Sequence, residues 1–211
     1  MLIQGQVGQP TTTSISSGSN PTIRLGQLGE LIVNELHGRY YETTYRRNMF
    51  TAALTSGTTT SAALATAHTG LLLLNPNNSS VNFVINKVNM SFLVAFAAAS
   101  AIGIQTGNQN TAALSSLTTT NTQIRSNFVG QPATSVGLTY SAATTTAPAL
   151  QMIFGAGLTG AITTTPQITG HVIDIEGSLI IPPGAWIGTY TSTASGASSM
   201  FASFTYEEVP I

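Results

Sequence analysis

From residue 50 onward, short apolar segments alternate with polar segments that favour turns. Residues 70–74 are apolar and end at residues 75–78, where Asn and Pro favour a turn. Residues 81–96 carry an apolar side chain at every second position up to Ile85, and the alternation resumes at Val88 with its phase shifted by one. Alternation with period two is typical of a strand with one buried face, and a phase slip indicates a β-bulge or a bend.

The remaining segments complete an all-β pattern. Pro182, Pro183 and Gly184 separate two of them, and Pro followed by Gly suits the two central positions of a type II turn. Long helical patterns are absent beyond the N-terminal third. The sequence therefore predicts a jelly-roll-like β-sandwich body over residues 51–211, preceded by an extended N-terminal arm and a charged contact segment over residues 1–50. The further strands are expected at residues 98–105, 135–140, 149–154, 171–181, 185–190 and 199–209.

The first part of the arm is polar and uncharged. Residues 4–22 offer almost nothing to bury, so they cannot offset their own ordering entropy unless another surface holds them. Two interpretations fit this composition: a flexible tail, or an arm that becomes ordered against a neighbouring subunit.

The second part of the arm, residues 24–47, allows two local structures. Acidic and basic residues between positions 35 and 46 recur at spacings of three and four, which would place them on one helical face, but Gly38 disfavours a continuous helix. Residues 40–50 also fit an extended segment. We expect a short helical or irregular segment to His37, followed by an extended one.

Charge is concentrated in this second part. The chain has six basic and seven acidic residues, and seven of these thirteen lie between positions 24 and 47. Arg, Tyr and matched opposite charges are suited to specific protein contacts. The alternative is a solvated face that carries most of the solubility, although solubility alone would not require such concentration. The predicted residues for binding a partner or a sister subunit are Arg24, Glu30, Glu35, Arg39, Tyr40, Tyr41, Glu42, Tyr45, Arg46 and Arg47.

Composition excludes several function classes. Only 6% of the 211 residues are charged, against about a quarter in an ordinary soluble domain. A net charge of -1 gives no electrostatic reason to expect binding to nucleic acid or to an anionic membrane. The absence of cysteine removes disulfides and thiolate metal sites. Residues 1–20 do not resemble a signal peptide, and the most apolar window, residues 92–104, is too short to span a bilayer.

No pattern of residues predicts catalysis. His37, His68 and His171 stand far apart, without the spacing of a metal site. Asp174 and Glu176 would lie about 7 Å apart on one strand face, a separation that inverting glycosidases use. Any strand with acidic residues on its wet face offers the same separation, so we expect no enzyme activity, no metal and no cofactor.

Four segments, in this order, resemble a group of tailed-bacteriophage virion proteins: GQVGQP, LGELIVNELHGRYYETTYRRNMF, IIPPGAWIGTY and YEEVPI. The resemblance covers both ends of the chain, and the middle only by composition. It implies a structural protein of the particle, most similar to a capsid cement (decoration) protein with a jelly-roll body. Such a protein would be made in the bacterial host cytoplasm, form homotrimers and bind the major capsid protein on the capsid surface of the virion.

The alternative is a tail or fibre protein that binds a receptor or a glycan, because jelly rolls also serve as adhesins. In that case the aromatic residues Tyr140, Trp186 and Tyr190 would form a platform for a sugar.

Overall fold

The computed structural model describes residues 5–7, 23–25, 38–109, 113–160, 170–196 and 199–211. The chain divides into two compact units, Met1–Tyr41 and Glu42–Ile211. In the first unit, strands β1 (Gly5–Val7) and β2 (Ile23–Leu25) pair in parallel. Most of the predicted arm, including residues 8–22 and 26–37, lies outside the described residues.

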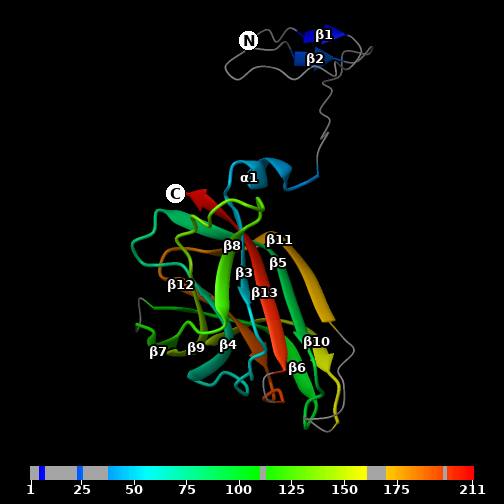
Figure 1. Ribbon diagram of the computed structural model, residues 1–211, viewed down its shortest axis with the longest axis vertical. Coiled ribbons are helices and arrows are strands. Elements are labelled where there is room, and N and C mark those ends of the chain that lie inside the picture. Colours follow the sequence, from blue (N-terminus) through cyan, green and yellow to red (C-terminus); the bar gives the residue numbers. More distant parts are fainter. Residues whose placement is uncertain (1–4, 8–22, 26–37, 110–112, 161–169, 197–198) are drawn as a thin grey trace. The chain divides into compact units, whose positions relative to one another are not determined.

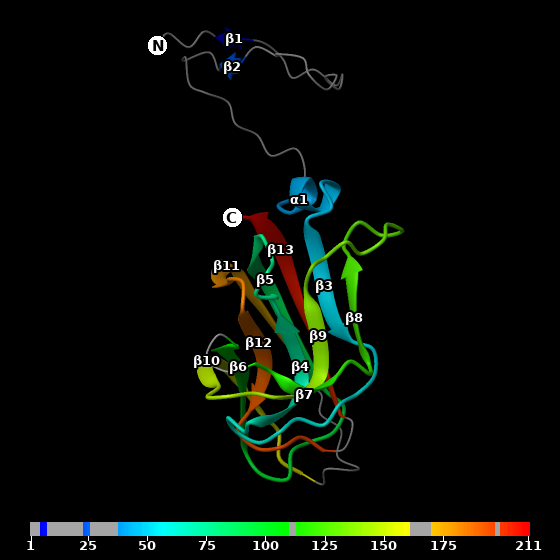
Figure 2. The ribbon, with the colours of Figure 1, turned by 90° about the vertical axis from the view of Figure 1, so that its left-hand side faces the viewer.

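The second unit, called the body below, is a β-sandwich, as predicted. Its two sheets are antiparallel and lie face to face (Figure 1, Figure 2). The five-stranded sheet has the order β11-β5-β13-β3-β8, and the six-stranded sheet has the order β10-β6-β12-β4-β9-β7. The strands are β3 (Met49–Leu54), β4 (Ala67–Leu74), β5 (Val81–Phe92), β6 (Ser100–Asn108), β7 (Ser115–Thr118), β8 (Thr122–Ser126), β9 (Leu138–Thr144), β10 (Ala149–Gly157), β11 (Gly170–Ile181), β12 (Ala185–Thr191) and β13 (Met200–Pro210).

Eight of these strands pair in a nested order. The first pairs with the last, β3 with β13, and inside this pair β4 pairs with β12, β5 with β11 and β6 with β10. Two further pairings, β13 with β5 and β12 with β6, close each sheet. The chain therefore behaves as one long hairpin that is rolled up on itself. The segment β7–β9 is inserted between β6 and β10 and adds β8 to one sheet and β9 and β7 to the other.

The main core fills the space between the sheets and includes Phe83, Phe204 and Tyr206. A second, smaller cluster contains Trp186, Tyr140 and Leu72. Strand β4 contributes to both, because Leu71 and Leu73 belong to the main core while Leu72 and Leu74 belong to the second cluster. A strand buried on both faces has a continuous apolar run, and this explains why the four consecutive leucines show no alternation.

The phase slip predicted in residues 81–96 is confirmed as a bulge. On β13, Tyr206 pairs with Ile85 and the preceding residue, Thr205, pairs with Lys87, so Asn86 has no partner in that register. Asn86 is buried. The bulge keeps Phe83 and Ile85 on the core side before it and Val88 on the core side after it.

The type II turn is also confirmed, and Asn75 ties it to the neighbouring turn. Gly184 has a φ of 84°, and the Ala185 N–H donates to the Pro182 carbonyl at 3.0 Å. Asn75, fully buried, exchanges backbone hydrogen bonds with this turn. Its side-chain Nδ2 donates to the carbonyls of Val81 at 2.8 Å and Ile181 at 2.9 Å. One amide thus links the ends of β4, β5 and β11.

The expectation of an extended segment over residues 40–50 is wrong. Helix α1 (Tyr41–Tyr45) occupies its first half, and β3 begins only at Met49. The predicted helical or irregular segment to His37 lies outside the described residues. Strands β7 and β8 were not predicted; β7 is exposed along its whole length and therefore shows no apolar alternation. No helix in the described part of the chain is long and apolar enough to cross a bilayer.

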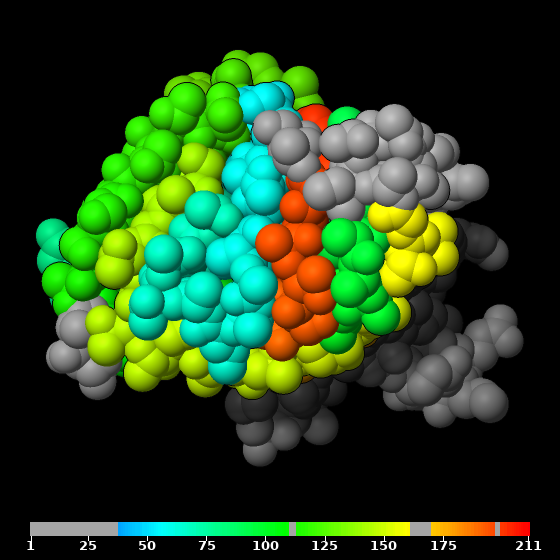
Figure 3. Space-filling view, turned by 90° about the horizontal axis from the view of Figure 1, so that it is seen from below, coloured from blue at the N-terminus to red at the C-terminus, as the bar shows by residue number. Residues whose placement is uncertain are grey.

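The two ends of the body differ in charge. Figure 3 views the end away from α1, where residues 55–66 (cyan), 93–99 (green) and 192–196 (orange) lie side by side. These loops contain no Asp, Glu, Lys or Arg. Hydroxyl groups hold them together instead: the Ser195 N–H donates to Thr60 Oγ1 at 2.9 Å, and the Thr60 N–H donates to Ser195 Oγ at 3.0 Å.

We predict that Asn75→Ala destabilises the protein by about 2 kcal/mol, because the Ile181 carbonyl loses its side-chain donor in a buried site and the Val81 carbonyl keeps only the Ser79 hydroxyl as a side-chain donor. Urea unfolding followed by circular dichroism measures this difference. Asn77→Ala, at an exposed position of the same turn, is the matched control and should stay within about 0.5 kcal/mol of the wild type. Equal stability of the two variants would mean that the Asn75 amide does not link the three strands.

Candidate contact surface

Helix α1 ends in a left-handed turn. The N–H of Arg47 donates to the Thr44 carbonyl and the N–H of Asn48 donates to the Thr43 carbonyl, both at 3.0 Å, which is the hydrogen-bond pattern of a Schellman motif. Arg47 occupies the position that glycine usually takes, with a φ of 64°. This conformation costs a residue with a Cβ atom about 1 kcal/mol. The turn redirects the chain so that Met49, the first residue of β3, is buried.

Two side chains of this turn lie against Phe128. The Tyr45 and Phe128 ring centroids are 6.1 Å apart, and the Arg47 guanidinium carbon lies 6.0 Å from the Phe128 ring centroid. Phe128 belongs to the loop of residues 127–137 between β8 and β9, which is anchored beside the turn because the Asn127 N–H donates to the Met49 carbonyl at 3.0 Å. Segments about eighty residues apart in sequence thus form one aromatic and cationic cluster.

A hydrogen-bond relay fixes the far end of the same loop. Ser135 Oγ lies 2.6 Å from both Tyr206 Oη and Glu208 Oε1. Since Ser135 has one proton and donates it to the carboxylate, the Tyr206 hydroxyl donates to Ser135. The Val136 N–H also donates to Glu208 Oε1 at 3.0 Å. Burial raises the pKa of Glu208, and the hydrogen bonds from Ser135, Val136 and Gly137 act in the opposite direction.

Between these anchors the loop exposes apolar side chains. Val129, in this loop, is 91% exposed, and Tyr45, on α1, is 61% exposed. The C-terminal residue Ile211, 76% exposed, lies at the same end, because β13 pairs with β3 and the Glu208 N–H donates to the Asn48 carbonyl at 2.9 Å. We call this region the α1-end surface; it comprises Tyr45, Arg47, Phe128, Val129, Val136, Val209 and Ile211. Exposed apolar groups around a cation are typical of protein-binding surfaces.

The ion pair in α1 adds little to stability. Arg46 Nε lies 3.5 Å from Glu42 Oε2, four residues earlier on the helix, and both side chains are mostly exposed. Water and salt screen such pairs strongly. Arg46 and Glu42 therefore remain accessible to a partner that offers better geometry.

The structure brings together only part of the predicted contact set. Glu42, Tyr45, Arg46 and Arg47 lie on or beside the α1-end surface. Arg39 lies 5.5 Å from the ring centroid of Tyr40, and Tyr41 begins α1. Arg24 lies in β2, where only the backbone is described, and Glu30 and Glu35 lie outside the described residues.

Sequence reasoning missed the loop side of this surface. Phe128 and Val129 stand in a long loop without periodicity, and nothing near them in sequence indicates contact with Tyr45. No pattern around Glu208 indicates its contact with Ser135. An adjacent pair of apolar residues in an otherwise polar loop, Phe128-Val129, was the one available signal.

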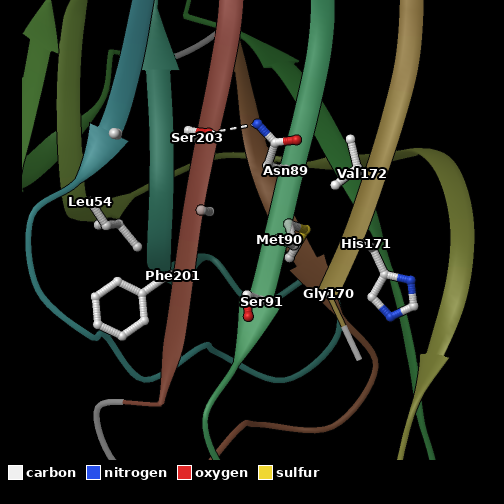
Figure 4. A pocket seen from close by; sticks show the side chains of 11 residues that line it. Leu54, Asn89, Met90, Ser91, Gly170, His171, Val172, Phe201 and Ser203 are labelled. Atoms are coloured by element: carbon white, nitrogen blue, oxygen red, sulfur yellow. Dashed lines mark hydrogen bonds between the residues drawn. The ribbon is translucent and has the colours of Figure 1, made fainter. Parts of the chain in front are cut away.

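The sugar platform that the alternative function would use does not form, because two of its three aromatic residues are buried. Trp186 is 1% exposed and Tyr140 is 6% exposed, and both pack in the second hydrophobic cluster. A different hollow of about 320 Å³ lies where β3, β5, β11 and β13 run side by side (Figure 4). Phe201 and Val172 lie on opposite sides of it, and between them Asn89 Nδ2 donates to Ser203 Oγ at 3.0 Å.

The titratable residues considered for chemistry are dispersed. Asp174 pairs with Lys87 at 3.1 Å, and Glu176 sits in an irregular part of β11 with a φ of 55°. His68 is buried, whereas His171 lies on β11 with its ring 6.5 Å from that of Phe154. Within the described ranges, no three His, Cys, Asp or Glu side chains gather in a way that could hold a metal ion.

Comparison with known protein families, with curated proteins and with solved structures finds no match for this chain.

We predict that Arg47→Gly and Arg47→Val differ in stability, although both remove the same cation. Glycine adopts a positive φ without strain, so Arg47→Gly should stay within about 1 kcal/mol of the wild type. Valine is β-branched and should destabilise the protein by at least about 1 kcal/mol more. Thermal or urea unfolding measures the difference. Indistinguishable variants would rule out the left-handed turn at Arg47.

Proposed function

We propose that this chain is a structural protein of a tailed-phage virion, a cement (decoration) protein that binds the assembled capsid and stabilises the shell. The observation that carries the proposal is the α1-end surface. It gathers aromatic and exposed aliphatic side chains around Arg47, in a chain of which only 6% of the residues are charged. Such a surface is suited to adhesion rather than to chemistry.

The strand order supports a jelly-roll body. The nested pairs β3–β13, β4–β12, β5–β11 and β6–β10 follow from rolling up one long hairpin, which places eight strands in two sheets as interlocked Greek keys. Viral capsid and lectin domains use this architecture. The fold is therefore compatible with a shell protein and with a binding protein, and the α1-end surface favours the shell protein.

The partners follow from the same proposal. Arg46 and Arg47 would pair with carboxylates of the major capsid protein or of a sister subunit, and Glu42 would pair with a base. Tyr45 and Phe128 would supply the buried anchors of the contact. A protein that binds the assembled lattice better than the dissociated one stabilises it by mass action. In a homotrimer, three modest contacts add up through effective concentration.

A tail or fibre protein that binds a receptor or glycan is the alternative. The hollow beside Phe201 favours it, because an apolar ring next to amide and hydroxyl groups suits one face of a sugar. Tyr140 and Trp186 no longer contribute to this alternative, since both are buried.

We predict that changes on the α1-end surface weaken binding to capsids at least tenfold without unfolding the body. Val129→Asp places a charge at a 91% exposed position, and Arg47→Glu reverses the charge beside Phe128. Co-sedimentation of purified variants with undecorated capsids measures occupancy. Ala98→Asp, an exposed position at the opposite end, is the matched control and should bind like the wild type.

The arm is tested separately. Deletion of residues 1–24 should lower occupancy and leave the circular dichroism spectrum of the body unchanged.

Equal occupancy of Val129→Asp, Arg47→Glu and Ala98→Asp would exclude the α1-end surface as the contact. Cryo-electron microscopy of the native particle decides between the two functions: hundreds of copies between capsomers support cement, whereas density only at the tail vertex supports the alternative.

A further inference from the structure

The six-stranded sheet has a weak seam between β4 and β12. Only three residue pairs join these strands, Trp186–Leu74, Ile187–Leu73 and Gly188–Leu72, whereas seven pairs join β12 to β6. The ladder ends where β4 bulges at Gly70, which has a φ of 133°. We call this boundary the β4–β12 seam; it separates β10, β6 and β12 from β4, β9 and β7.

A histidine side chain replaces the missing backbone pairing. His68, on β4, places Nε2 3.1 Å from the Thr189 carbonyl on β12. Gln105 Nε2, on β6, donates to the same carbonyl at 3.0 Å. Because a carbonyl oxygen only accepts, His68 must carry its proton on Nε2, which leaves a lone pair on Nδ1. The backbone of Asn75 extends the seam at its other end, where it bonds with Gly184 and Ala185, and the His68 side chain extends it on the Gly70 side.

In the part of the chain that the structure describes, no charged side chain pairs with this ring. It is 1% exposed, and among the described residues Nδ1, Gln105 Oε1 and Thr189 Oγ1 are buried without a hydrogen-bond partner. Burial lowers the pKa of His68 to about 4, against 6.5 for an exposed imidazole, although the hydrogen bond to the Thr189 carbonyl acts in the opposite direction. A proton on Nδ1 would be a charge in an uncompensated site.

The strands around the ring supply no charged side chain that could compensate a proton on His68. β4, β6, β9 and β12 carry no Asp, Glu, Lys or Arg, and their other titratable side chains are Tyr140 on β9 and Tyr190 on β12. β13 approaches the site with Met200, whose Cε lies near Gly70. The acidic residues of β13, Glu207 and Glu208, follow at least seven residues later, about 23 Å along the strand.

We propose that His68 is an acid-sensitive lock on the β4–β12 seam: the neutral ring holds the two strands together, and protonation of Nδ1 favours their separation. Burial in the closed seam favours the neutral imidazole of His68. The open seam therefore binds the proton more tightly than the closed one. The stabilisation that His68 gives to the closed seam is complete above pH 6.5 and is lost as the pH falls towards 4. At pH 5 the opening equilibrium should be about 30-fold higher than at pH 8.

Hydrogen exchange on the full-length protein tests the lock. We expect the protection factors of the Leu72 and Gly188 amides, corrected for the intrinsic pH dependence of exchange, to fall about 30-fold between pH 8 and pH 5. Amides of the β5–β13 ladder should fall much less. Trp186 provides a second readout, because it is the single tryptophan, is buried and lies across the seam against Leu74 and Tyr140. Its quenching by acrylamide should rise in the same pH range.

Two histidine variants make the test specific. His68→Gln keeps a side-chain N–H donor but does not titrate, so the excess loss of protection at the seam should disappear. His171→Gln, on the other sheet, should retain it. The proposal is overturned if His68→Gln shows the same pH dependence as the wild type, or if protection falls equally in both sheets. Should His68→Gln fail to fold, an NMR titration of wild-type His68 decides: an apparent pKa of 6 or above excludes the lock.

Discussion

The nested antiparallel pairing of eight strands is the constraint on which the rest of the body depends. Because β3 pairs with β13 and β4 pairs with β12, each residue near the start of the body is placed beside one near its end. This pairing brings the turn after α1 next to Glu208, and it brings His68 next to Thr189. The α1-end surface and the β4–β12 seam are both consequences of rolling up one long hairpin.

Neutral polar side chains take over where this ladder is interrupted. Asn75 completes the ends of three strands, His68 extends the seam at the bulge, and Ser135 ties the loop of residues 127–137 to β13. Each of these groups is buried or half-buried, and each satisfies a backbone or side-chain partner that would otherwise lose its hydrogen bond. A chain with 6% charged residues thus uses amides, hydroxyls and one neutral imidazole in places where salt bridges would carry a desolvation cost.

The α1-end surface combines strain with exposure. Arg47 holds a left-handed conformation that glycine would adopt more easily, and its guanidinium lies over Phe128 instead of pointing into bulk solvent alone. The relay of Tyr206, Ser135 and Glu208 holds the opposing loop in place, so the exposed Val129 and the half-buried Phe128 are presented on a fixed support.

The sequence alone determined the fold class, the main strands, the bulge at Asn86 and the turn at Gly184, because alternation and turn chemistry act between neighbouring residues. Tertiary structure decided what covers each face. Trp186 looked available for a ligand, yet it is buried, because Tyr140 and Leu72 from other strands pack against it. Most of the α1-end surface escaped prediction for the same reason: Phe128 meets Tyr45 only after β3 and β8 have paired, and no local pattern encodes a contact across about eighty residues.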